Sequence, residues 1–168
     1  MPIVKVVGFD CATDDAVLAA CAGEEVVFER EVPPGGDGRP AHSGALLAGI
    51  VAAAEALGGW QSVDRVAVGL GPGTFTGLRI AASTATGLAI STGVPVVGVS
   101  TLEAMASSLG APDAVRFPVL DARRGEVFIA AYGREGEVIL PPAALSPEAA
   151  IAAILATAGP VAVGGPGA

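Results

Sequence analysis

The glycine-rich stretch from Gly69 to Arg79 is the part of the chain best suited to chemistry. It reads Gly-Leu-Gly-Pro-Gly-Thr-Phe-Thr-Gly-Leu-Arg and joins an apolar run to a segment with a helical pattern. Backbone N–H groups at such a junction, together with the helix dipole, can hold a phosphate. Gly71, Gly73 and Thr74 are therefore candidates for a phosphate loop. The stretch matches neither a Walker A loop nor a dinucleotide fingerprint, and a tight turn that only packs closely is an equally good interpretation.

Asp10 and His42 are the other residues that could support catalysis. Asp10 follows the first apolar run, where a carboxylate could lie near phosphates or a metal ion, although an Asp there more often stabilises a turn. His42 is the only histidine, and no Cys or His spacing typical of a metal site accompanies it. A Ser43–His42–Asp10 triad can be written, but adjacent Ser and His side chains at a helix start rarely face one another. We therefore expect neither a metal centre nor a triad.

The composition indicates a folded chain with little affinity of its own for nucleic acid. Its 168 residues carry 9 Lys+Arg against 17 Asp+Glu, and the formal net charge of −8 repels phosphate backbones. Hydrophobic residues make up 52% and charged residues 15%, which excludes disorder. Two uncharged windows, residues 80–102 and 149–168, are interrupted by Gly and Pro and predict no membrane span. No secretory pattern precedes Lys5, so we expect a cytoplasmic protein without membrane contacts.

Apolar runs and turn residues predict strands followed by alternating helices and strands. The predicted strands are Ile3–Phe9, Ala16–Cys21, Glu25–Glu31, Arg65–Leu70, Pro95–Val99, Arg116–Leu120, Glu126–Tyr132, Val138–Leu140 and Val161–Val163. The predicted helices are Gly44–Leu57 with Ser43 as N-cap, Thr76–Ser91, 101–109 and Ser146–Thr157. Cys11 and Cys21 fall at opposite ends of the first strand pair, too far apart for a disulfide.

This order predicts an α/β fold. Three antiparallel strands, extended by strands that follow crossover helices, form a mixed sheet with helices on both faces. A ribonuclease-H-like lobe has this order, and actin-like ATPases and sugar kinases contain two such lobes.

The helices predicted at Gly44–Leu57 and Thr76–Ser91 carry apolar or small residues on every side. A surface helix of a globular protein normally has a polar face. Small residues instead let the backbone of a second helix approach closely, which increases dispersion contacts. We therefore predict that a protein partner covers the outer face of these helices.

Several stretches together resemble the TsaB (YeaZ) family of bacterial tRNA threonylcarbamoyladenosine biosynthesis. They are Phe9–Thr13, His42-Ser43 with Leu46-Leu47, Gly71–Ile80, Val99–Ala104 and Asp121–Val127. The resemblance covers essentially the whole chain, and the glycine-rich stretch and Asp-Ala-Arg-Arg-Gly-Glu are its most specific parts. It implies an actin-like (ASKHA) fold with an N-terminal ribonuclease-H-like lobe at residues 1–101. A second lobe at residues 102–168 would be truncated, because family members usually continue beyond the Gly-Gly-Pro-Gly-Ala end.

The resemblance implies a scaffold subunit that is not itself an enzyme. Members of the family pair with TsaD, which transfers the threonylcarbamoyl group to the adenosine next to the anticodon of tRNAs, and the ATPase TsaE joins the complex. Without TsaD, the same helical surface forms a homodimer. The chain would meet tRNA only indirectly. It would bind no cofactor by itself, whereas ATP or ADP and a metal ion would belong to the complex with TsaD.

The resemblance also places the functional residues. The implied partner interface comprises Leu46, Leu47, Ile50, Phe75, Leu78, Arg79, Ala82, Ala85, Thr86 and Ala89. The residual phosphate loop comprises Asp10, Gly71, Gly73 and Thr74. Two positions depart from the family pattern: Cys11 replaces a common hydroxyl residue, which weakens the phosphate site, and Thr86 replaces a frequent Lys. An actin-like ATPase or phosphotransferase that uses Asp10 and the loop is the alternative function, and a glycoprotease-like peptidase is a more distant one.

Overall fold

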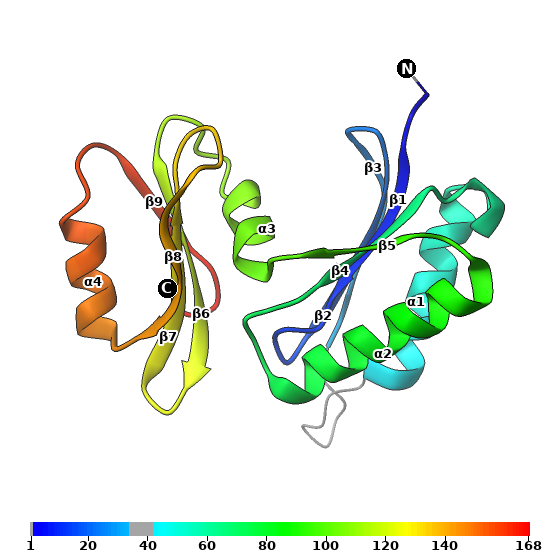
Figure 1. The fold of residues 1–168 in the computed structure, drawn as a ribbon, viewed down its shortest axis with the longest axis horizontal. Helices are drawn as coiled ribbons and strands as arrows, with labels where there is room; N and C mark the ends of the chain where they lie inside the picture. Colours follow the sequence, from blue (N-terminus) through cyan, green and yellow to red (C-terminus); the bar gives the residue numbers. More distant parts are fainter. Residues whose placement is uncertain (1, 34–41) are drawn as a thin grey trace. The chain divides into compact units, whose positions relative to one another are not determined.

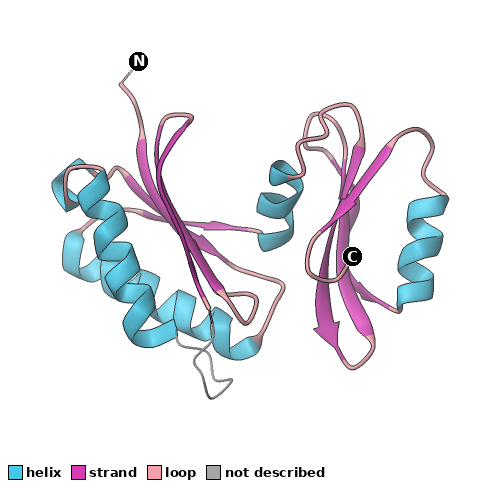
Figure 2. Cartoon of the chain, turned by 180° about the vertical axis from the view of Figure 1, so that it is seen from behind, coloured by secondary structure: helices cyan, strands magenta, loops and turns pink. Residues whose placement is uncertain are grey.

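The structure, a computed structural model, describes residues 2–33 and 42–168, and the side chains of residues 42 and 43 lie outside the described part. The chain divides into two compact units, Met1–Val99 and Ser100–Ala168. Figure 1 follows the chain through both, and Figure 2 distinguishes helices from strands. The domain boundary expected from the sequence, after residue 101, lies two residues beyond this division. We describe the units one at a time.

Unit 1 contains a five-stranded sheet and two long helices. Its elements are β1 (Lys5–Asp10), β2 (Ala16–Ala22), β3 (Glu25–Val32), α1 (His42–Ala56), the 3₁₀ turn η1 (Trp60–Ser62), β4 (Arg65–Gly69), α2 (Phe75–Thr92) and β5 (Val96–Val99). The strand order is β3-β2-β1-β4-β5. β1 is antiparallel to β2 and parallel to β4, and β4 is parallel to β5. The predicted mixed sheet, a meander extended by strands after crossover helices, is confirmed.

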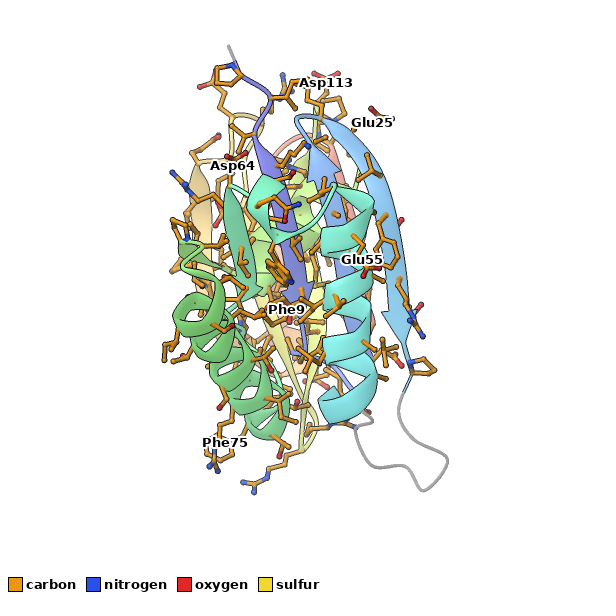
Figure 3. All side chains as sticks on the ribbon, turned by 90° about the vertical axis from the view of Figure 1, so that its right-hand side faces the viewer. Phe9, Glu25, Glu55, Asp64, Phe75 and Asp113 are labelled. Carbon is orange, nitrogen blue, oxygen red and sulfur yellow. The ribbon has the colours of Figure 1, made fainter. Side chains whose placement is uncertain are left out.

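Both helices of unit 1 pack on the same face of its sheet (Figure 3). The inward side chains of the strands, such as Phe9 and Val66, join those of α1 and α2 in one continuous hydrophobic core. The small residues help this packing: a Cβ at Gly49 would lie 2.8 Å from a methyl group of Leu18, so α1 lies unusually close to β2. The helices that the sequence predicted on both faces of the sheet are therefore not found among the described residues of unit 1.

Unit 2 contains a four-stranded sheet covered on both faces. Its elements are α3 (Thr101–Ser108), β6 (Val115–Arg123), β7 (Glu126–Tyr132), β8 (Val138–Leu145), α4 (Pro147–Leu155) and β9 (Val161–Gly164). The strand order is β8-β7-β6-β9, with β9 parallel to β6. Leu120 and Ala130 pack with α3, whereas Val119 and Ile129 pack with α4. Because neighbouring strand residues point to opposite faces, the two helices cover opposite faces of this sheet.

Two predicted element bounds were wrong for identifiable reasons. β8 extends to Leu145 through Pro141 and Pro142, whereas the predicted strand ended at Leu140. Proline is tolerated in β8 because this is an edge strand, in which one side needs no ladder N–H. Helix α1 begins at His42, so Ser43 lies inside the helix and is not its N-cap.

Candidate partner-docking helices and glycine-rich loop

The glycine-rich loop between β4 and α2 is bound tightly to the turn that follows β1. The Thr74 backbone N–H donates to the Ala12 carbonyl oxygen at 2.7 Å. The Thr74 side chain is the N-cap of α2, and its hydroxyl oxygen accepts from the Gly77 N–H at 3.3 Å. Two N–H groups that could face a phosphate therefore already have partners within the chain.

The glycines of this loop leave no space for an added atom. A Cβ at Gly73 would lie 2.4 Å from the Ala12 carbonyl oxygen, and a Cβ at Gly77 would lie 1.8 Å from the Cys11 carbonyl oxygen. Gly71 has a φ of 88°, a conformation that favours glycine, and is itself buried. The glycines thus permit close packing of two backbone segments, and in this chain the loop has the geometry of a packed turn.

Asp10 lies at the end of β1 and faces the end of β4. Its Oδ1 accepts from the Ala12 backbone N–H at 2.6 Å, which is the turn-stabilising role expected of an Asp in this position. A Cβ at Gly69 would lie 2.0 Å from Asp10 Oδ2, so the carboxylate packs directly against the β4 backbone. A carboxylate so close to the loop opposes binding of an anion. The residues present do not form a phosphate cradle in the chain by itself.

Cys11 lies in the core of unit 1, next to Asp10. Cys11 is fully buried beside Asp10, and burial first, then the negative charge of Asp10, raise its pKa from 9.0 to about 12. Because a thiol is nucleophilic only as the thiolate, Cys11 is inert at neutral pH. Both Cys11 and Cys21 are free, as predicted, since β1 and β2 pair with Val6 opposite Cys21.

Helix α1 divides its long side chains between the core and the surface. Leu46 and Ile50 are buried in the core of unit 1, so their expected place in a partner interface is corrected: they support the helix from inside. Leu47 remains 49% exposed and Val51, one turn further on, 39%. Val51 was missed by the sequence reasoning, although its i,i+4 spacing from Leu47 could have indicated it.

Helix α2 has one buried and one exposed stripe. Its buried positions are Gly77, Ala81, Ala85 and Leu88, so Ala85 also leaves the expected interface. Leu78 and Ala89 lie at the margin, half-buried. The exposed stripe, spaced by three and four residues, comprises Phe75, Arg79, Ala82, Thr86 and Ile90.

Large apolar side chains at both ends of this stripe are open to solvent. Phe75 is 73% exposed and Ile90 81%. Ile90 was not predicted as an interface residue, although it lies one turn beyond Thr86. We name the exposed residues Leu47, Val51, Phe75, Arg79, Ala82, Thr86 and Ile90 the outer helical face. It combines large apolar ends with a small centre, a surface suited to close helix packing.

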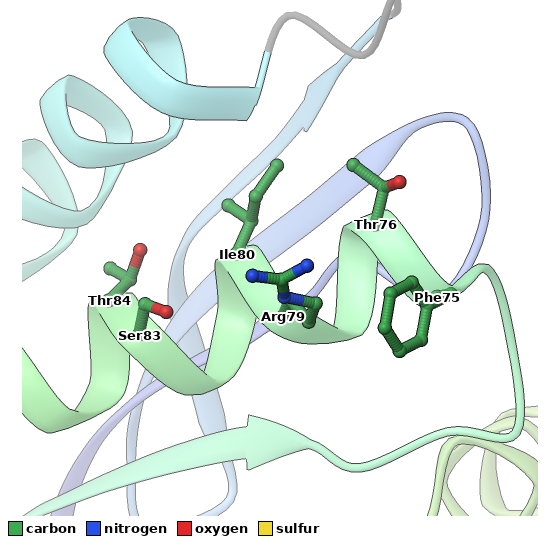
Figure 4. A pocket seen from close by; sticks show the side chains of 6 residues that line it. All are labelled: Phe75, Thr76, Arg79, Ile80, Ser83 and Thr84. Carbon is green, nitrogen blue, oxygen red and sulfur yellow. The ribbon is translucent and has the colours of Figure 1, made fainter.

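A hollow borders this outer helical face on α2 (Figure 4). Its volume is about 440 Å³, and it is lined by Phe75, Thr76, Arg79, Ile80, Ser83 and Thr84. The Arg79 guanidinium lies above the Phe75 ring, with Cζ 5.3 Å from the ring centroid, a cation–π geometry.

The charged hairpin tip of unit 2 is a solvated turn. Positive φ angles of 66° and 56° occur at Arg123, the last residue of β6, and at Arg124, in the turn before β7. The Arg123 guanidinium lies 3.8 Å from Asp121, and both side chains are exposed.

Within residues 2–33 and 42–168, no group of three or more His, Cys, Asp or Glu side chains could hold a metal ion. None of the helices described is long and apolar enough to span a membrane. The Ser43 and His42 side chains of the formal triad lie outside the described part.

Solved structures share this fold. The structure described as YeaZ from Pseudomonas aeruginosa matches with a TM-score of 0.71 at 28% identity, covering 87% of this chain and 68% of that one. A second solved structure from the same organism, described as an uncharacterized protein with similarity to peptidase YEAZ, matches with a TM-score of 0.72 at 29% identity. It covers 87% of this chain and 68% of that one. With its two mixed sheets, the chain is therefore an α/β protein of the actin-like (ASKHA) class.

Sequence comparisons are more specific than the fold. The model of the family described as "TsaD: tRNA N6-adenosine threonylcarbamoyltransferase" matches residues 39–162. The Escherichia coli tRNA threonylcarbamoyladenosine biosynthesis protein TsaB is 38% identical over 91 residues, which are 48% of this chain and 39% of that protein. TsaB of Bacillus subtilis is 39% identical over 72 residues, 43% of this chain and 31% of its own length. The matches thus span less than half of either relative. The chain belongs to this family and, within it, to the TsaB/YeaZ proteins.

Proposed function

We propose that the chain is a non-catalytic scaffold subunit of tRNA threonylcarbamoyladenosine biosynthesis that docks TsaD through the outer helical face. The observation that carries the proposal is the exposed stripe on α2, where Phe75 and Ile90 flank the small Ala82. Removing water from such apolar side chains costs little free energy, and another helix that packs against them adds dispersion contacts. TsaE would join through the complex, and tRNA would be met only indirectly. The role of the TsaB relatives in tRNA threonylcarbamoyladenosine biosynthesis supports this assignment.

The proposal assigns no cofactor to the chain alone. The loop N–H groups of Thr74 and Gly77 already have partners, and the Asp10 carboxylate lies beside the loop. ATP or ADP and a metal ion would instead belong to the complex with TsaD. When the partner is absent, the outer helical face would pair with a second copy of itself, which hides the same apolar side chains.

Substitution of Ala82 by Glu tests the docking surface. Ala82 is exposed, so the change should leave the fold intact, but in the complex it would bury a charge without a partner. Size-exclusion chromatography with light scattering, on the variant mixed with TsaD from the same organism, should show no 1:1 complex. Ala152→Glu makes the same change at an exposed position of α4 and should pair normally. An intact complex with the Ala82 variant would exclude this surface.

Nucleotide calorimetry separates the scaffold from the alternative ATPase or phosphotransferase. That alternative requires the isolated chain to bind Mg-ATP through Asp10 and the glycine-rich loop. The packed loop predicts no binding heat for the chain alone. Saturable heat that disappears in an Asp10→Asn variant would favour the enzyme.

A further inference from the structure

The hollow on α2 has the form of a groove for another helix. Its lining residues fall into two neighbouring rows with four-residue spacing, 75-79-83 and 76-80-84. Such rows are the ridges of a helix surface, and a ridge of a second helix packs into the groove between them. The volume of about 440 Å³ is too large for one small ion and suits several side chains of a helical ridge.

The polar groups of this hollow have no partners in the described part of the chain. Arg79 forms no ion pair with the described residues, and its guanidinium contacts the Phe75 ring. The hydroxyls of Thr76, Ser83 and Thr84 likewise form no hydrogen bond with any described residue. A partner that covered these groups without pairing them would incur their desolvation. A well-matched partner must therefore bring hydrogen-bond acceptors.

We infer that the hollow receives the carboxylate of an Asp or Glu side chain from a helix of the TsaD-type subunit, an inference that rests on the proposed function. Arg79 is the only Lys or Arg in α1 and α2. Its planar guanidinium can donate two parallel hydrogen bonds to one carboxylate, and the hydroxyls of Ser83 and Thr84 lie one turn away to donate more. The Phe75 ring holds the guanidinium from one side and presents an apolar surface to the stem of the incoming side chain.

Two other occupants fit less well. Binding of a nucleic acid backbone requires several neighbouring cationic side chains, whereas this hollow has one, Arg79. The net charge of −8 on the chain also repels phosphates. If a second copy of the chain filled the hollow, the one carboxylate on its α1 and α2 would be that of Glu55, in the last turn of α1. A different subunit with an acidic side chain on its docking helix therefore matches the hollow better than either.

Isothermal titration of the chain with TsaD from the same organism tests the carboxylate. Arg79→Met should weaken the complex about tenfold or more, because it leaves a covered carboxylate without its partner. Arg79→Lys keeps the charge but cannot donate two parallel hydrogen bonds, so its affinity for TsaD should lie between those of the wild type and Arg79→Met. Arg65→Met removes the same charge from an exposed site on β4 and should leave the affinity unchanged. Added salt should weaken the wild-type complex more than the Arg79→Met complex.

Charge exchange identifies the carboxylate directly. Arg79→Glu should lose binding, and one Asp→Lys or Glu→Lys change on a helix of the TsaD subunit should restore it. Equal affinities for Arg79→Met and wild type would overturn the inference. The inference would also be overturned if Arg79→Met weakened only tRNA binding by the complex, because the occupant would then be nucleic acid. It would likewise be overturned if Glu55→Gln abolished self-association of the chain as completely as Arg79→Met does, because the occupant would then be a second copy.

The two proposals fail differently. If Ala82→Glu still pairs with TsaD, docking through α2 is excluded and the carboxylate inference falls with it. If Ala82→Glu abolishes pairing while Arg79→Met does not weaken it, docking stands and only the occupant of the hollow is wrong. Arg79 is exposed, so thermal unfolding of its variants should match that of the wild type.

Discussion

Gly77→Ala should destabilise the chain strongly, against the usual effect of this substitution in a helix. The new Cβ would lie 1.8 Å from the Cys11 carbonyl oxygen and 2.7 Å from Thr74 Oγ1, whereas ordinary contacts lie at 3.4–4 Å. The nearest obstacle is backbone, which cannot rotate aside as a side chain can. The β1–β2 turn and the start of α2 would therefore have to separate by roughly 1.5 Å, breaking the Thr74–Ala12 hydrogen bond.

Two opposing terms set the size of the effect. Forced overpacking costs about 3 kcal/mol at the upper end of its usual range. The upper end applies here because the obstacle is a backbone carbonyl, which cannot move aside. Alanine in place of glycine stabilises a helix by about 1 kcal/mol. The net loss is about 2 kcal/mol. In a unit of the size of Met1–Val99, each kcal/mol lowers the Tm by about 4–8 °C, so the unfolding of unit 1 should occur about 8–16 °C lower.

Gly87→Ala provides the matched control in the same helix. A Cβ at Gly87 meets nothing within 4 Å, so only the helix-propensity gain of about 1 kcal/mol remains and the Tm should rise. Thermal unfolding followed by far-ultraviolet circular dichroism would compare both variants with the wild type. If Gly77→Ala also raised the Tm, or left it unchanged, the close approach of the turn to α2 would be refuted.

Two further predictions concern titratable groups. Because the folded chain retains the Cys11 proton that the unfolded chain loses above pH 9.0, wild-type stability should fall between about pH 9 and 12, by at most about 1.4 kcal/mol per pH unit. Urea unfolding on both sides of pH 9.0 should show a smaller fall for Cys11→Ala, and identical pH dependence in both chains would contradict the assigned burial. Ser146 is the N-cap of α4, where its hydroxyl oxygen accepts from the Ala149 N–H at 3.3 Å, so Ser146→Ala should cost about 1 kcal/mol. The pKa of Glu148 is lowered first by its own backbone N–H and then by the Ser146 hydroxyl; an NMR titration should find it higher in Ser146→Ala, and an unchanged pKa would argue against that contact.

The alternation of strands and helices could be read from the sequence because its signals are local. The helix predicted at Thr76–Ser91 corresponds to α2 (Phe75–Thr92). Thr74 is its N-cap, and Gly93, with a φ of 72°, is its C-cap. The course of β8 through Pro141 and Pro142 could not be predicted, because proline is tolerated there only through the edge position of that strand. An edge position is a property of the assembled sheet.

The candidate interface was predicted at the level of helices but not of side chains. Leu46 and Leu47 are identical residues at adjacent positions, yet one is buried in the core and the other is exposed. A helix that is apolar on every side provides no hydrophobic period from which to distinguish its two faces. The phosphate loop was uncertain for a related reason, since Gly73 and Gly77 serve close packing as well as they would serve an anion, and only the position of the β1–β2 turn decides between them.

The hydrogen bond between Thr74 and Ala12 has a kinetic consequence for any protein that meets the outer helical face. It fixes the start of α2 to the turn that follows β1, the central strand of the sheet, so the helix is already in place before an encounter. An incoming subunit would not wait for a segment to fold, and association should proceed at about 10⁵–10⁷ M⁻¹s⁻¹, as expected for docking of rigid surfaces. Substitutions on the outer helical face should then change chiefly the lifetime of the complex.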